Sequence, residues 1–525
     1  MTEDGGSPVY DIAVIGGGIN GCGIARDAAG RGLKVFLCEQ ADLGGATSSA
    51  SSKLIHGGLR YLEQYQFRLV SKSLRERETL LKNSPHLITP LRFLLPHHPG
   101  LRPAWLLRAG LLLYDVLGGK RSLSRSRQVN LATHPGGAAL KAEFSVGFEY
   151  ADCWVDDARL VIAAAADARR LGAVVETRTH GQSAARVDGL WDIALNDARG
   201  GRASVRAKAL VNATGPWVDK GFTAPAGVQS AAAAGRRGTG VKLVQGSHIV
   251  VKKWFAGEHA YILQNRDRRV VFVIPFERDW ALVGTTEAEY HGDPAKTRIT
   301  PAETDYLCAT VARYFTVALT PEDVVWSYSG VRPLYDDGSD DSLREATRDY
   351  SIRLDPGQPP MVTVYGGKLT TFRRLAEAVL AELTPYFPAI KPPWTAAAPL
   401  PGGDRMAADE IVEALSKTYP FLPPSLRERY LSAYADQAFK MLGDAAAIGD
   451  LGRHFGHGLY ETEAAYLVEH EWAGSAEDIL WRRTKLGLRF EAREVAGLQE
   501  WLDARFNHPN VSRKSPALGR VNRGC

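Results

Sequence analysis

The chain has 525 residues, of which 45% are hydrophobic and 23% are charged, a globular composition that excludes disorder as the main state. At roughly 150 residues per domain, this length predicts about three domains. A net charge of +5 is too small to favour a nucleic acid as the main partner. The acidic, glycine-rich N-terminus predicts no signal peptide, and no uncharged apolar run approaches the roughly 18 residues that span a bilayer.

The first predicted unit is a strand, a glycine-rich turn and a helix. Residues 10–15 are rich in strand-forming side chains, the sequence GGGING follows at 16–21, and a helix is expected over 22–30. A second strand, expected over 34–38, ends at Glu39. Gly16, Gly18 and Gly21 form the pattern that lets backbone approach a pyrophosphate at a helix N-terminus. Glu39 can bind ribose hydroxyls and would repel a 2′-phosphate, so the unit predicts a dinucleotide other than NADP.

The segment 100–127 carries an excess charge equal to that of the whole chain. It has six basic residues and one acid, Asp115, beside Trp105 and a cluster of leucines. The basic residues are Arg102, Arg108, Lys120, Arg121, Arg125 and Arg127. Such a segment predicts an interfacial anchor on an anionic membrane surface, and a core helix with a solvated basic flank is the alternative.

The middle of the chain, about 150 to 365, mixes short predicted strands with a few helices. Asp156 and Asp157 are interpreted as a helix cap before residues 160–171,. Strands are expected over 209–213, 248–251, 270–274 and 361–365, and the Ala/Gly-rich stretch 231–240 is expected to be a loop.

Two later turns favour FAD over NAD. Ala213 and Gly215 follow a predicted strand and are small enough to let the chain return to a dinucleotide. The strand at 361–365 runs into GGKLTT (366–371) and a helix to about residue 383, which is a second strand–glycine–helix unit. Its helix N-terminus would suit the flavin end that becomes negative on reduction. Two such turns far apart in sequence fit an enclosed flavin better than an exchangeable NAD.

The composition changes near residue 385. Prolines are frequent from 385 to 401 and predict a stiff connector. Beyond it the pattern is helical, and Ser475 with Asp478 forms a predicted capping box. We expect interleaved cofactor and substrate domains over 1–385, a Pro-rich linker over 386–399 and a helical cap over 400–525.

The cysteines indicate neither a metal site nor a disulfide framework. There are five, with no C-x-x-C pair and no zinc-site spacing: Cys22, Cys38, Cys153, Cys308 and Cys525,. They are expected to be small core side chains of a protein in a reducing compartment.

Several segments together resemble the FAD-dependent glycerol-3-phosphate dehydrogenases. They are TSSASSKLIHGGLRYL (47–62), DCWVDDAR (152–159), VNATGPW (211–217), GSHIVV (246–251), SGVRPL (329–334) and GGKLTT (366–371). The match runs over nearly the whole chain in the same order, which makes it far more specific than the first glycine motif.

The resemblance implies a Rossmann-like FAD domain interleaved with an antiparallel-sheet substrate domain, plus an all-α C-terminal domain. It implies oxidation of sn-glycerol 3-phosphate to dihydroxyacetone phosphate, with hydride transfer to FAD and electrons passed to membrane quinone. It also implies a homodimer bound peripherally to the cytoplasmic side of the cell membrane.

The resemblance and the chemistry together assign candidate site residues. Arg60 and Arg332 are the candidates for the phosphate site, because guanidinium groups present forked donors. His248 is the candidate base, with a structural histidine as the alternative. Lys368 is a candidate to bind a substrate oxygen or to stabilise reduced flavin, and Tyr61 is a weaker candidate for substrate binding. The cofactor candidates are Gly16, Gly18, Gly21, Glu39, Thr47, Ser48, Ser49, Ser51, Lys53, Ala213, Gly215, Gly367, Lys368, Leu369 and Thr370.

Three other functions stay open on the sequence alone. A glycerol-3-phosphate oxidase would use the same site and pass electrons to oxygen. An amino-acid oxidase of the same superfamily would need a carboxylate site in place of a phosphate site. A flavin-binding sensor would bind the cofactor without turnover.

Overall fold

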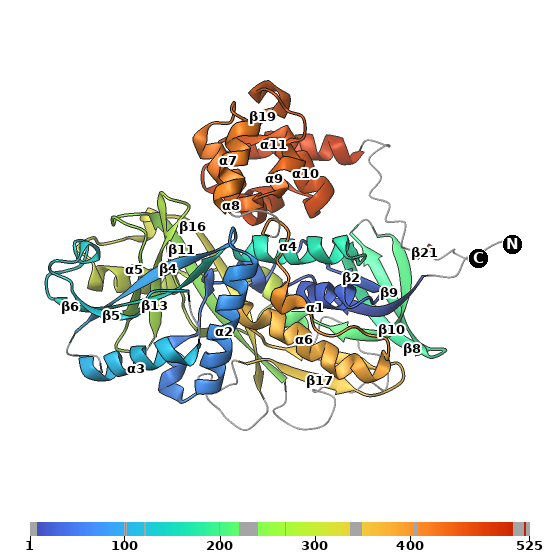
Figure 1. The fold of residues 1–525 in the computed structure, drawn as a ribbon, viewed down its shortest axis with the longest axis horizontal. Helices are drawn as coiled ribbons and strands as arrows, with labels where there is room; N and C mark the ends of the chain where they lie inside the picture. Colours follow the sequence, from blue (N-terminus) through green and yellow to red (C-terminus); the bar gives the residue numbers. More distant parts are fainter. Residues whose placement is uncertain are drawn as a thin grey trace.

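The computed structural model describes residues 8–98, 100, 102–119, 122–198, 200–219, 240–267, 269–336, 349–403, 408–507 and 519–520. Two sheets with their helices form the body of the molecule, and a helical domain stands on one end of it (Figure 1). Among the described residues no helix is long and apolar enough to cross a membrane. The loop predicted over 231–240 lies outside the described residues, except for Gly240, where a strand begins.

The first sheet contains the predicted dinucleotide unit. Its neighbouring strands follow the order β17-β18-β10-β1-β2-β7, and the pairs from β18 to β7 are parallel. The hairpin β8–β9 extends from β10. The strands are β1 (Val9–Ile15), β2 (Val35–Cys38), β7 (Val174–Glu176), β8 (Thr179–Val187), β9 (Leu190–Asp197), β10 (Arg202–Asn212), β17 (Ser351–Asp355) and β18 (Met361–Tyr365).

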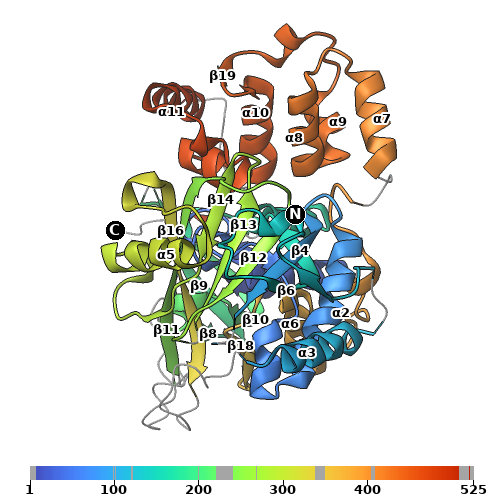
Figure 2. The ribbon, with the colours of Figure 1, turned by 90° about the vertical axis from the view of Figure 1, so that its left-hand side faces the viewer.

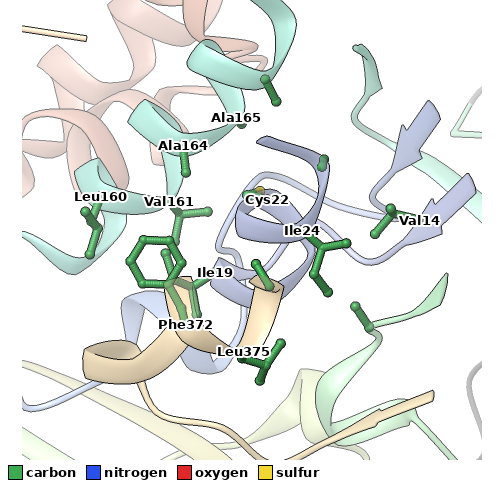
Figure 3. Packing of buried hydrophobic residues seen from close by; sticks show 14 of the residues in the cluster. Val14, Ile19, Cys22, Ile24, Leu160, Val161, Ala164, Ala165, Phe372 and Leu375 are labelled. Atoms are coloured by element: carbon green, nitrogen blue, oxygen red, sulfur yellow. The ribbon is translucent and has the colours of Figure 1, made fainter. Parts of the chain in front are cut away.

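Three helices cover one face of this sheet: α1 (Ile19–Gly30), α4 (Asp157–Arg170) and α6 (Phe372–Leu383). Small residues let them approach closely, since a Cβ on Gly23 would lie 2.7 Å from the Phe372 ring. Figure 3 shows Val161, Phe372 and Ile19 meeting between the helices. The segments that build this domain therefore come from both ends of the region 1–385, as interleaving requires.

The second sheet is antiparallel except where β12 pairs with β4 in parallel. Its order is β15-β11-β14-β13-β12-β4-β6-β3, with β16 beside β11 and β5 beside β6. The strands are β3 (Leu54–Ile55), β4 (Ile88–His97), β5 (Arg127–Asn130), β6 (Val146–Val155), β11 (Gly240–Lys252), β12 (Ala260–Gln264), β13 (Val270–Phe276), β14 (Trp280–Gly284), β15 (Ala288–Glu289) and β16 (Val324–Asp336).

Three further helices accompany the body: α2 (Phe67–Asn83), α3 (Ala104–Leu117) and α5 (Pro301–Tyr314). Helix α3 lies at the end of the molecule opposite the helical domain in both views (Figures 1 and 2). A segment without long regular structure, 386–399, leads to that domain.

The C-terminal domain has its own apolar core, formed by residues between 411 and 502. Its helices are α7 (Ala408–Thr418), α8 (Pro424–Tyr434), α9 (Gln437–Leu442), α10 (Glu461–Glu471) and α11 (Ala492–Asn507), with one short hairpin, β19–β20 (His454–Gly456 and Leu459–Tyr460). The predicted capping box is confirmed, because the Asp478 N–H donates to Ser475 Oγ and the Ser475 N–H donates to Asp478 Oδ2.

The expected fold class is confirmed: a parallel-sheet dinucleotide domain, a mainly antiparallel second sheet and a helical C-terminal domain. Cys22, Cys38, Cys153 and Cys308 are buried and free, as expected, and Cys525 lies outside the described residues. Burial raises the pKa of the Cys22 thiol. Of the two aspartates read as a cap, Asp156 caps α4 through the Arg159 N–H, while Asp157 binds Lys53.

Candidate active site

One cavity of about 1690 Å³ lies between the two sheets and is also lined by three residues of the C-terminal domain. It exceeds the roughly 300–1,000 Å³ of a pocket for a single small molecule, so it has room for a dinucleotide together with a substrate. All the predicted site residues line it except Gly21, which lies beneath the first turn.

The first turn has the geometry that a pyrophosphate site requires. Gly16 has a φ of +114°, and a Cβ on it would lie 2.5 Å from the Ala213 carbonyl oxygen. A Cβ on Gly21 would lie 1.9 Å from the Gly16 carbonyl oxygen. Larger residues are therefore excluded at both positions, and the N-terminus of α1 opens toward the cavity as an anion site.

Glu39 lies at the end of β2, as predicted. Its Oε2 accepts a hydrogen bond from the Gly17 N–H at 2.7 Å, and its Oε1 accepts one from the Ala41 N–H at 2.9 Å. A carboxylate has about four acceptor positions, so these bonds orient Glu39 and leave acceptor positions for ribose hydroxyls. Burial raises the pKa of Glu39, and the backbone donors oppose that rise.

The second glycine turn joins the first, although 346 residues separate the bonded pair. Asn20 Nδ2, in the first turn of α1, donates to the Gly366 carbonyl oxygen at 3.1 Å. Gly366 and Gly367 have φ values of +68° and +98°, and a Cβ on Gly367 would lie 2.9 Å from Asn20 Nδ2. The two turns predicted separately from the sequence form one site, and its residues fit an enclosed dinucleotide.

Lys368 and Tyr61 also come together. The Lys368 Nζ lies 3.8 Å from the centroid of the Tyr61 ring, a cation–π distance. Tyr61 itself follows Gly58, whose φ of +79° turns the chain there. These two predicted substrate ligands therefore reach the cavity as a pair, from segments about 300 residues apart.

The two candidate phosphate-binding arginines converge on one carboxylate. Arg60 Nη1 lies 3.7 Å from Glu287 Oε2, and Arg332 Nη1 lies 3.6 Å from Glu287 Oε1. Arg332 Nη2 also donates to Thr285 Oγ1 at 3.1 Å. A Cβ on Gly246 would lie 2.6 Å from Arg332 Nη2, so this glycine makes room for the guanidinium group. The result is a paired cation site open to the cavity.

His248 is buried, 2% exposed, at the floor of the cavity. Its Nε2 lies 2.9 Å from Ser52 Oγ, and its ring stacks on Tyr328 with centroids 4.9 Å apart. Gly284 lies opposite it in the sheet, where a Cβ would be 2.2 Å from the His248 ring. Burial, followed by the charges of Arg332 and Lys53, lowers the pKa of His248 well below 6.5. The imidazole is therefore neutral and fixed in place, as a proton acceptor must be.

The serine-rich loop behaves differently from the glycine turns, because most of its side chains bond to the protein. Thr47 Oγ1 donates to the Val331 carbonyl oxygen at 2.6 Å, and Ser51 Oγ donates to Asp157 at 2.7 Å. Lys53 Nζ forms a buried ion pair with Asp157 at 2.6 Å. Ser48 Oγ accepts from the Ile19 N–H at 3.0 Å, at the pyrophosphate end of α1. The cofactor contacts assigned to this loop stay predictions.

Sequence reasoning missed several residues that line the cavity. Tyr328 comes from β16, Thr285 and Glu287 come from the connection between β14 and β15, and Trp481 and Arg482 come from the C-terminal domain. None lies in a glycine turn, and the strand pairing that brings them here has no local signature. The sequence motif around Arg332 is their nearest signal, because β16 also carries Tyr328.

Helix α3 borders the same cavity through Leu106, Leu107, Leu111 and Leu113. Its outer face carries large exposed apolar side chains, with Trp105 71% and Val116 68% exposed. The predicted basic excess is partly neutralised by acids outside the segment, since Arg102 pairs with Glu63 and Arg127 with Glu149. Lys120 and Arg121 lie outside the described residues.

Comparison with known families agrees with this geometry. Residues 11–373 match the family of FAD-dependent oxidoreductases, and residues 393–504 match the C-terminal domain of alpha-glycerophosphate oxidase. The chain is 52% identical to a glycerol-3-phosphate dehydrogenase of Pseudomonas aeruginosa, covering 95% of this chain and 96% of the relative. It is 48% identical to a D-erythritol 1-phosphate dehydrogenase of Brucella abortus, over 94% of this chain and 97% of the relative.

The solved structures give a neighbour that holds the cofactor. The glycerol-3-phosphate dehydrogenase of Bacillus halodurans, complexed with FAD, superimposes with a TM-score of 0.71 at 26% identity, covering 94% of each chain. Together with the family match, this confirms the expected FAD dependence. FAD would supply a hydride acceptor, and the residues of the two glycine turns and Glu39 would hold it.

Proposed function

We propose that this chain, which belongs to the FAD-dependent oxidoreductases of the glycerol-3-phosphate dehydrogenase family, oxidises sn-glycerol 3-phosphate and delivers the electrons to membrane quinone. The observation that carries the proposal is the convergence of Arg60, Arg332, His248 and Lys368 on the cavity that holds the glycine turns. A phosphate site, a neutral base and a flavin site are the three parts that this reaction requires.

Arg60 and Arg332 would hold the phosphate dianion, since two guanidinium groups offer several forked donors. Glu287 lies between them, so an arriving dianion must displace this carboxylate from its place beside the arginines. His248 would accept the proton of the C2 hydroxyl while the C2 hydrogen leaves as hydride. Dihydroxyacetone phosphate is then the product, and Lys368 would hold its oxygen.

Helix α3 supports the choice of quinone as acceptor. A quinone dissolved in lipid can reach a flavin only through an apolar opening, and the leucines of α3 border the cavity beside exposed Trp105. An amphipathic surface of this kind lies in the plane of a membrane. We therefore place α3 on an anionic membrane surface, peripheral to the bilayer.

The substrate has one specific competitor. The relative that oxidises D-erythritol 1-phosphate is almost as similar to this chain as the glycerol-3-phosphate dehydrogenase is, and both substrates end in a phosphate. The purified protein should be yellow and should bleach anaerobically when glycerol 3-phosphate is added. Faster bleaching with D-erythritol 1-phosphate would transfer the assignment to that substrate, and no bleaching with either would favour a sensor.

The acceptor is tested separately, after the flavin has been reduced. Reoxidation should be fast with a short-chain quinone and slow with oxygen, whereas rapid peroxide formation would indicate an oxidase. Leu106→Glu, at the cavity border, should slow reoxidation by quinone and leave bleaching unchanged. Val116→Glu is the matched control, because Val116 is exposed on the same helix and does not line the cavity.

A further inference from the structure

The C-terminal domain contributes a wall to the FAD cavity. Glu477, Trp481 and Arg482 line the cavity together with the loop 39–47, except for its residues Asp42 and Leu43. They belong to the segment Asp478–Arg483 and the residue before it. The resemblance and the family matches assign FAD binding to the N-terminal region, so this contact extends the cofactor site into a second domain.

Two arginines of this segment hold the loop 39–47 through one aspartate. Arg482 Nε lies 2.5 Å from Asp42 Oδ2, and Arg483 Nη2 lies 2.9 Å from Asp42 Oδ1. Asp42 is 4% exposed and Arg483 is 1% exposed, so the pairs are largely shielded from water. Breaking one partner of such a buried pair is costly, which makes the contact a firm one.

The loop held by Asp42 continues directly into the phosphate-binding turn. The Gly44 N–H donates to the Gly17 carbonyl oxygen at 3.0 Å, and Glu39 precedes the loop and accepts from the Gly17 N–H. A displacement of the C-terminal domain therefore acts on the turn that receives the pyrophosphate and on the residue that receives the ribose.

A second contact closes the cavity from the other sheet. Trp481 stacks on Trp326 of β16, with ring centroids 4.1 Å apart and planes 17° apart. Both rings line the cavity. Arg178 in turn pairs with Asp478, and although burial raises the pKa of Asp478, the guanidinium groups of Arg178, Arg483 and Arg482 bring it to about 2. The segment is thus fixed to both halves of the body.

We propose that the C-terminal domain retains the cofactor: Trp481 closes the cavity against Trp326, and Arg482 and Arg483 hold the loop 39–47 in its FAD-binding position. Arg482 and Arg483 are positioning residues, because they act through Asp42. The proposal concerns FAD alone and holds for either substrate. Because these contacts raise the equilibrium affinity for FAD, linkage makes the effect reciprocal, and bound FAD in turn holds the domain more firmly.

The test measures FAD release from the full-length holoenzyme after dilution, through the rise in flavin fluorescence. Arg482→Gln and Trp481→Leu should each release FAD at least tenfold faster than the parent protein. Arg505→Gln is the matched control, because it breaks an exposed ion pair to Glu469 within the same domain and should leave the release rate unchanged. Arg482→Lys, which keeps the charge, should restore part of the retention.

Three results would overturn the proposal. The first is FAD release in Arg482→Gln and Trp481→Leu at the rate of the parent protein. The second is faster release that is matched by Arg505→Gln, because the effect would then follow general loosening of the domain. Hydrogen exchange gives an independent reading should a variant fold poorly: in the parent protein, amides of 471–483 should exchange more slowly with FAD bound than in the apoprotein. Equal exchange in the two forms would also overturn the proposal.

Discussion

Replacing His248 by glutamine tests the central chemical step. Glutamine is close in size to histidine and keeps a polar end near Ser52, but it cannot accept a proton at neutral pH. General-base catalysis contributes about 10²- to 10⁴-fold, which corresponds to roughly 3–5 kcal/mol of barrier at about 1.36 kcal/mol per tenfold. We expect His248→Gln to slow anaerobic flavin reduction by that factor while FAD stays bound. The His248 side chain contacts Ser52 and Tyr328, which lie outside the glycine turns.

Stopped-flow bleaching of the flavin at saturating substrate isolates this step from quinone reduction. The pH dependence adds a second measure with a definite sign. Because the pKa of His248 is lowered well below 6.5, the base is unprotonated at neutral pH, and the rate of flavin reduction at saturating substrate should fall only below pH 6.5. This acidic decline should be absent in His248→Gln.

The matched control is His259→Gln. His259 is a second histidine with a lowered pKa, about 4, and it does not line the cavity, so its replacement should leave bleaching unchanged. A loss of less than about tenfold in His248→Gln, under about 1.4 kcal/mol, would refute the assignment of His248 as the base and leave it a packing role against Tyr328.

Three further predictions concern the charges around the site. Arg332→Ala should raise the KM for substrate steeply and leave FAD bound, and an unchanged KM would remove Arg332 from the phosphate site. Glu287→Gln should lower the KM about fivefold, because the two partly exposed ion pairs that phosphate must break together cost about 1 kcal/mol, whereas a raised KM would mean that Glu287 itself binds the substrate. Asp157→Asn should lower the free energy of unfolding in urea by about 3–5 kcal/mol, because it leaves the buried Lys53 charge unpaired. Lys72→Met, which breaks a pair whose side chains are 28% and 40% exposed, should cost about 1 kcal/mol or less, and equal losses in the two variants would contradict the buried-pair argument.

Features fixed by neighbouring residues could be predicted from the sequence. The turn at 16–21 needs glycine because backbone atoms crowd it, and that need is visible in the pattern G-x-G-x-x-G followed by Glu39. The turn at 366–371 and the helical character of the C-terminal domain are equally local. The assignment of Arg332 and Lys368 to the same site came from motifs, and the structure brings both to one cavity.

Features fixed by long-range pairing could not be predicted. Glu287 lies beside Arg332 because β11 pairs with β14 on one side and with β16 on the other. No sequence pattern near Glu287 predicts this pairing. The motif predicts Lys53 as a cofactor ligand, and it does not show that Asp157, 104 residues away, pairs with its charge. The excess charge of 100–127 is likewise a sum along the chain. In the fold, Glu63 and Glu149, from outside this segment, pair with Arg102 and Arg127 and neutralise part of that charge.

The two ends of the cavity place opposite demands on the protein, and the fold separates them. Helix α3 borders the cavity with leucines and carries an exposed apolar face, the surface proposed above to admit an acceptor from the membrane. A cofactor next to such an opening needs closure elsewhere. The C-terminal domain stands at the opposite end of the molecule from α3 (Figures 1 and 2) and contacts the loop beside the phosphate-binding turn through Asp42. On these two proposals, closure acts on the nucleotide end and access on the other end, so electron delivery would not require the cofactor site to open.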